Sequence, residues 1–147
     1  MNKNTYVLTL FLSLCCLGPT ANSLENTSTE ATRISSKAYD LLVRLEDLAK
    51  TANCKDALAS AKTAIKSETY TDYEYAQITN ITSYCYYLSG DYEGALKGYK
   101  KILKTNNLPD DFYFRTAQSL GAILAEQDRY NEASRTIEEV IPLLETP

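Results

Sequence analysis

The chain of 147 residues contains no histidine and only four cysteines. Two of those cysteines, Cys54 and Cys85, lie beyond the leader that we expect to be removed, so the common nucleophile-base pairs and metal clusters are unavailable. Neighbouring acids such as Glu138 and Glu139 point about 100° apart on a helix, which makes them surface charges rather than an acid and a base that face one substrate. The composition therefore predicts a protein that is not an enzyme and that uses no cofactor or metal.

A long apolar run is also missing. Residues 6–17 form a short one that follows Lys3 and is broken by Gly18-Pro19, the layout of a secretory signal peptide and too short to span a bilayer comfortably. We expect residues 1–23 to be this signal peptide and the protein to be exported, to a periplasm or the medium. An uncleaved amino-terminal anchor is the alternative.

The small residues near the end of the leader place cleavage after Ser23, with Ala21 as the second candidate. Cys15 and Cys16 resemble a bacterial lipoprotein signal only loosely, because Leu14 stands where that pattern has a small residue. We therefore favour an exported protein without a lipid. Contact with a membrane is expected only if the leader is uncleaved or lipidated.

An excess of positive charge is absent as well. Without the leader, 14 basic and 19 acidic residues leave a net charge of −5. A nucleic-acid partner is not expected for an acidic chain that has no basic stripe.

Cys54 and Cys85 stand well apart in the sequence and allow two interpretations. In an oxidising compartment they form a disulfide, which would stabilise the fold by about 3 kcal/mol. Alternatively both are small core residues, since antiparallel helices would leave the two sulfur atoms about one turn out of register.

What the chain does have is a repeat. Residues 90–103 combine a Gly-Asp turn with apolar residues at spacings of three and four, and residues 128–141 repeat this pattern 38 positions later. A third copy stands 38 positions earlier around Ala57. The alanines Ala95 and Ala133 are expected at the closest helix crossings, and positions in the core or in the groove wall are expected for Tyr86, Tyr92, Tyr99 and Tyr130, with Tyr86 in the core.

Residues 24–36 are rich in Ser, Thr, Asn and Glu and are expected to be a flexible lead-in, and residues 37–147 to be the repeat domain. Glycosylation triplets begin at Asn26 and Asn80, which matters only in a host that glycosylates. Apolar periodicity and capping residues predict an all-α fold of six helices in three pairs, with Pro142 ending the sixth near Ile141. The expected helices span about 36–52, 55–66, 72–89, 92–105, 109–127 and 130–141.

The helix pairs resemble tetratricopeptide repeats. The family's features are present in the central copy as Tyr86, Gly90-Asp91-Tyr92 and Ala95, and in the third copy as Leu120-Gly121 and Ala133. The resemblance covers residues 38–141 and implies a right-handed α-α solenoid that binds a protein or peptide. The repeat of this chain is longer than the family's usual period of about 34 residues, so the longer loops should change the superhelical pitch.

In this family the first helix of each pair lines a concave groove. Carried over by position, the groove residues are Tyr39, Leu42, Glu46, Gln77, Asn80, Tyr84, Tyr87, Arg115, Gln118 and Ala122. The clamp by which some members hold a terminal carboxylate is not expected, because Leu42 and Glu46 occupy its basic and amide positions. Asn80, Tyr84 and Tyr87 are expected to share one face, with Arg115 beside it.

These features lead to two hypotheses. The first is an exported adaptor that holds a partner's peptide or helix in the groove. The second is a structural subunit that dimerises through its uncapped carboxyl-terminal helix, where Ile137, Ile141 and Leu144 would be exposed.

Overall fold

The computed structural model describes residues 32–144, with side chains through Pro142. The expected signal peptide, Cys15, Cys16 and the triplet at Asn26 lie outside the described residues. The part that the structure describes contains helices and no strand. The helices are α2 (Ser36–Lys50), α3 (Cys54–Ser67), α4 (Asp72–Leu88), α5 (Tyr92–Leu103), α6 (Asp110–Glu126), α7 (Tyr130–Glu138) and the short α8 (Ile141–Leu144).

Side-chain caps define the beginnings of α2 and α4. Ser35 accepts a hydrogen bond from the first turn of α2, as its position before the apolar pattern predicts. At α4, Thr71 and Glu74 form a capping box in which each side chain bonds the other residue's backbone N–H, at 3.2 and 2.9 Å. Glu74 also accepts a 2.7 Å bond from the Ser35 N–H. One carboxylate therefore joins the beginnings of α2 and α4.

The same turn closes the first helix of each pair. Ala52, Gly90 and Asp128 have positive φ values of 56°, 78° and 59°, and they follow one another at the period of the repeat. In each turn the next residue donates its N–H to a carbonyl five residues earlier, at 2.8, 2.9 and 2.9 Å. This is the six-to-one bond of a Schellman motif. The same turn therefore recurs at the period of the sequence repeat, although only one of the three turns has glycine.

The turn at Ala52 corrects the predicted end of the first helix. The apolar pattern suggested a helix through Ala52, but α2 ends at Lys50 because Ala52 takes the left-handed conformation. The sixth helix was predicted to end near Ile141, and in the structure the regular helix is interrupted close to that residue. Helix α7 ends at Glu138, and α8 begins at Ile141 with Pro142 in its first turn, where proline's missing N–H is not needed.

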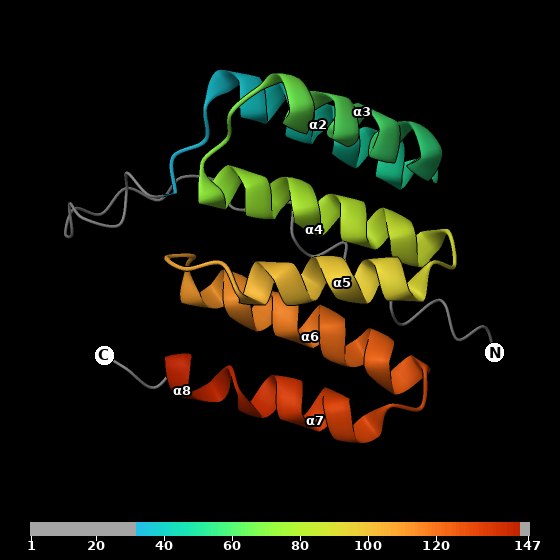
Figure 1. The fold of residues 1–147 in the computed structure, drawn as a ribbon, viewed down its shortest axis with the longest axis vertical. Helices are drawn as coiled ribbons and strands as arrows, with labels where there is room; N and C mark the ends of the chain where they lie inside the picture. The colour runs from blue at the N-terminus through green and yellow to red at the C-terminus, as the bar shows by residue number, and fades with distance from the viewer. Residues whose placement is uncertain (1–31, 145–147) are drawn as a thin grey trace.

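The helices pack in chain order (Figure 1). Close contacts join the two helices within each pair, α2 with α3, α4 with α5 and α6 with α7. Other close contacts join α3 to α4, α5 to α6, and α2 directly to α4. No described helix is long and apolar enough to cross a membrane.

Two apolar clusters fill the interior. One lies mainly between α4, α5 and α6 and has Tyr99, Leu96, Ile123 and Leu124 among its buried members. The other lies between α2, α3 and α4 and includes Leu45, Ile78, Cys54 and Cys85. Helix α4 contributes to both clusters, so it is the element that joins the first pair to the second.

The four tyrosines expected in the core or in the groove wall separate into three groups. Tyr99 is completely buried and Tyr92 is half-buried, whereas Tyr86 is 36% and Tyr130 62% exposed. The predictions for Tyr86 and Tyr130 were therefore wrong. Tyr86 lies about 200° around α4 from Tyr84, and Tyr130 is the first residue of α7, where its hydroxyl donates to Asp128 at 2.8 Å.

Small residues line the crossings within the pairs. Ala95 is completely buried, as predicted. One turn further along α5, a Cβ atom at Gly98 would lie only 2.0 Å from Oγ and 3.1 Å from Cβ of Ser83 in α4. At the crossing of α6 with α7, a Cβ atom at Gly121 would meet Ile137 at 3.4 Å and the carbonyl of Ala133 at 3.8 Å. Gly98 therefore permits α5 to approach α4 more closely than Ala95 alone suggested.

Candidate functional site

Five side chains of α4 follow one another at spacings of four, three, four and three residues. This places them along one side of the helix, and all five are half-buried. We call this set the tyrosine stripe. Its members are Tyr73, Gln77, Asn80, Tyr84 and Tyr87.

The carboxyl-terminal half of the tyrosine stripe is aromatic. The rings of Tyr84 and Tyr87 stack with their centroids 6.4 Å apart and 21° between their planes. The edge of a third ring, Tyr92 of α5, meets Tyr87 at 5.9 Å. Tyr84 packs against the cluster of the first pair and Tyr87 against that of the second. The predicted pairing of Tyr84 and Tyr87 on one face is thus present, and neither ring is fully buried.

Two bridges join the tyrosine stripe to α6. At one end the rings of Tyr73 and Phe112 meet edge to face at 5.9 Å. At the other end the Tyr87 hydroxyl donates to Glu126 at 3.0 Å, across 39 residues of sequence. Burial first, and then the Glu126 carboxylate, raise the pKa of the Tyr87 phenol. Side chains therefore connect α4 and α6, whereas direct helix packing connects α2 and α4.

The bridges indicate where Arg115 lies along the stripe. Both join residues 39 apart, so Arg115 lies level with Ala76, one residue before Gln77 and about two turns from Tyr84. Its guanidinium pairs with Asp111 at 2.8 Å, one turn earlier on the same helix. By the same register Gln118 lies within one residue of the level of Asn80, and both of these side chains are half-buried.

The remaining predicted residues are on the stripe or on α2. Gln77 donates to the Tyr73 hydroxyl at 2.8 Å, so its amide is held along α4. Tyr39 of α2 is mostly exposed. The sequence reasoning missed Tyr73, Phe112 and Glu126 as neighbours of the site. The sequence could have indicated Tyr73, because it stands one turn before Gln77 on the same helix. The two α6 residues are near the site only because α6 packs beside it.

Two surface hollows lie elsewhere. The larger, of about 660 Å³, is between α2 and α3, and the smaller, of about 400 Å³, adjoins the caps at Ser35 and Thr71. Lys37 borders both and forms a 3.2 Å ion pair with Glu68. None of the predicted site residues lines either hollow. The tyrosine stripe is thus a helix face and not an enclosed pocket.

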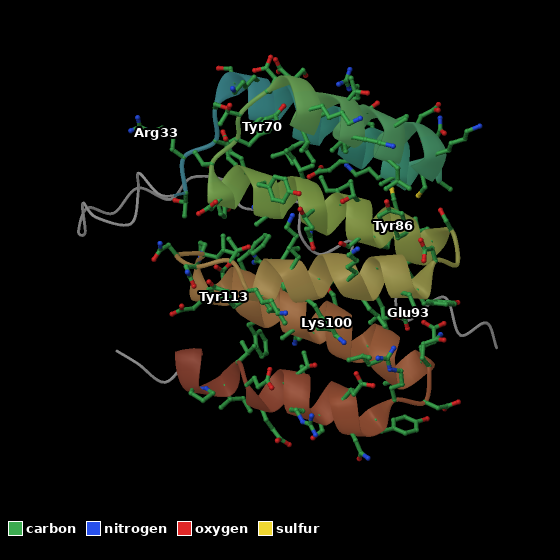
Figure 2. All side chains as sticks on the ribbon, in the orientation of Figure 1. Arg33, Tyr70, Tyr86, Glu93, Lys100 and Tyr113 are labelled. Atoms are coloured by element: carbon green, nitrogen blue, oxygen red, sulfur yellow. The ribbon has the colours of Figure 1, made fainter. Side chains whose placement is uncertain are left out.

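Charged side chains connect α5 to α7. Arg129 binds Glu93 at 2.8 Å and Glu132 at 2.7 Å, and Lys100 lies 3.6 Å from Glu132. Hydrogen bonding to Arg129 lowers the pKa of the Glu132 carboxyl. Figure 2 shows Glu93 near one end of α5 and Lys100 further along it. These partly exposed pairs connect the second helices of two units and leave no acid poised as a proton donor.

Cys54 and Cys85 are both free thiols and both buried. Both belong to the apolar cluster between α2, α3 and α4. Burial first, and then the nearby Cys54 thiol, raise the pKa of the Cys85 thiol. Among the described residues, no group of three His, Cys, Asp or Glu side chains is placed to hold a metal ion.

No protein-family model, curated protein or solved structure matches the chain.

Proposed function

We propose that the chain is an exported adaptor of the tetratricopeptide type, a right-handed solenoid of three helix pairs that binds an extended segment of a partner protein. The first helices of the pairs, α2, α4 and α6, would line the binding face. The recurrence of the Schellman turns at the period of the repeat and the packing of the helices in chain order support this arrangement. The role is binding rather than catalysis.

The stacked pair of Tyr84 and Tyr87 carries the proposal. Two rings held side by side on a half-buried helix face offer rigid aromatic area that loses little entropy when a partner binds. Asn80 one turn before, and Gln118 within one residue of its level on α6, offer amide groups that can bond the main chain of an extended segment. Rings that cover a ligand's side chains and amides that bond its backbone suit a peptide ligand.

The experiment selects peptide ligands from a random displayed library on the folded protein and measures their affinities by fluorescence anisotropy. Replacing Tyr84 or Tyr87 by alanine should weaken binding about 5- to 30-fold. Both rings pack on core clusters, so some stability will also be lost, and affinities are compared well below the melting temperature.

Tyr86→Ala is the matched control, because Tyr86 is on the same helix but points away from the stripe. Figure 2 labels it near the end of α4. Its loss should leave affinity unchanged. Equal weakening by Tyr86→Ala, or none by Tyr84→Ala and Tyr87→Ala, would contradict the proposed site.

One observation favours the second candidate function, self-association through the carboxyl-terminal end. Ile141 is exposed there, although Ile137 is half-buried against Gly121. Size-exclusion chromatography with light scattering separates the candidates. A monomer at micromolar concentration supports the adaptor, and a dimer that Ile141→Glu dissociates supports the structural subunit.

A further inference from the structure

The two cysteines beyond the leader meet at the contact between the first and second helix pairs. Cys54 is the first residue of α3 and Cys85 lies one turn before the end of α4. The two helices run in opposite directions, so these ends are adjacent (Figure 1). Cys54 is 5% and Cys85 0% exposed, and both belong to the same apolar cluster. Two buried thiols that share one cluster at the adjacent ends of packed helices are placed for a disulfide that needs no large movement of either helix.

Their surroundings disfavour other uses of the sulfur atoms. Burial, and then the hydrogen bond and charge of Cys54, raise the pKa of the Cys85 thiol, which keeps it protonated and a poor nucleophile. Within the described ranges no third His, Cys, Asp or Glu side chain completes a metal site with them. Bonding to each other is the chemistry that remains.

We propose that Cys54 and Cys85 form a structural disulfide that ties the first helix pair to the second when the chain folds in the presence of a low-molecular-weight disulfide such as oxidised glutathione. One cysteine thiolate attacks the oxidant and releases the first glutathione thiol, leaving a mixed disulfide. The second cysteine thiolate attacks that bond and releases the second thiol. The two cysteines lose two electrons and two protons, and the oxidant's broken S–S bond gains them.

The burial of the two thiols decides when they can be oxidised. A dissolved disulfide cannot reach Cys85 in the folded protein and reaches Cys54 only slightly. Oxidation should therefore be rapid during refolding and slow afterwards, and the finished bond should resist reduction until the protein unfolds. The proposal concerns the joint between two helix pairs and does not depend on peptide binding by the tyrosine stripe.

The test refolds the reduced, denatured full chain with a mixture of reduced and oxidised glutathione. Free thiols are then blocked with N-ethylmaleimide in denaturant and the protein is digested with trypsin. Residues 51–55 and 67–97 each contain one of the two cysteines and no internal tryptic site. The expected product is these two peptides linked, lighter than their sum by two hydrogen atoms.

The melting temperature of the oxidised protein should fall by about 10 °C after reduction, because the bond closes a long loop in the unfolded chain. In a Cys54→Ala, Cys85→Ala double variant the melting temperature should not depend on redox conditions. The proposal is overturned if the protein refolds and both peptides carry maleimide. It is also overturned if Cys54 or Cys85 is found linked instead to Cys15 or Cys16.

Discussion

Replacing Gly98 by alanine tests the packing of α4 against α5 at its tightest described glycine. The new Cβ atom would lie 2.0 Å from Oγ and 3.1 Å from Cβ of Ser83. Ser83 is buried, and its hydroxyl donates to the Thr79 carbonyl at 2.7 Å. The hydroxyl would have to rotate away and lose that bond, and the two helices would still have to separate slightly.

The expected cost combines three effects. Overpacking a well-filled site costs about 1 to 3 kcal/mol. Loss of the Ser83 hydrogen bond costs about 1 kcal/mol. Alanine gains about 1 kcal/mol over glycine inside a helix. The net expectation is a loss of about 2 kcal/mol, which is a large part of the stability of a small domain.

Urea denaturation followed by far-ultraviolet circular dichroism measures this loss. Gly121→Ala is the matched control, because its Cβ would meet Ile137 at an ordinary 3.4 Å, and its stability should be unchanged or slightly higher. Adding Ser83→Ala to Gly98→Ala should recover part of the loss as a coupling energy. If Gly98→Ala were as stable as Gly121→Ala, α4 and α5 could not be as close as the structure has them.

Three further substitutions test the ends of the helices. Burial alone would raise the pKa of Glu74, but hydrogen bonds from Ser35 and Thr71 outweigh it and hold the pKa below its ordinary value. The stability from this carboxylate is therefore complete above the unfolded pKa of about 4.3 and is lost as pH falls through the folded value. The difference in unfolding free energy between wild type and Glu74→Gln should shrink over that range, and a constant difference would contradict this. Ala52→Gly should raise the unfolding free energy by about 1 kcal/mol because Ala52 has a φ of 56°, whereas Gly90→Ala should lower it similarly; no change in either would show that the turns relax.

Helix positions could be predicted from the sequence because the signals are local. Ser35 and Thr71 stand immediately before apolar periodic runs, and the Thr71–Glu74 spacing is that of a capping box. The end of α2 was missed because Ala52 fits the apolar pattern and is not a residue that usually adopts a left-handed conformation. Only comparison with Gly90, one period later in the chain, indicates that the turn must recur there.

Exposure was harder to predict than periodicity. Tyr130 recurs 38 positions after Tyr92, and Tyr86 stands between Leu48 and Leu124 at the same period, yet a repeated position is buried only where a neighbouring element covers it. The sequence shows that a residue recurs and does not show what packs on it.

One part of the candidate site could likewise be predicted from the sequence, and another part could not. The pairing of Tyr84 with Tyr87 follows from a spacing of three residues on one helix, and the structure has it. The bond from Tyr87 to Glu126 depends on how far α6 lies from α4, which the loop between α5 and α6 decides. The level of Arg115 along the stripe depends on that loop as well, so the sequence alone could not assign it.

The two interfaces of α4 differ in kind, and this difference gives the ring pair its significance. Helix α4 packs directly on α2, to which the Glu74 carboxylate also joins it, and on α3, where Cys54 faces the same cluster as Cys85, but it reaches α6 through side chains at its two ends. Tyr84 packs on the first cluster and Tyr87 on the second, so the stacked rings straddle the two units. A change in the angle between α4 and α6 would disturb the Glu126 bond, whereas the ring stack lies within α4 itself. A partner that bound both rings, as proposed, would therefore contact side chains that pack on both apolar clusters.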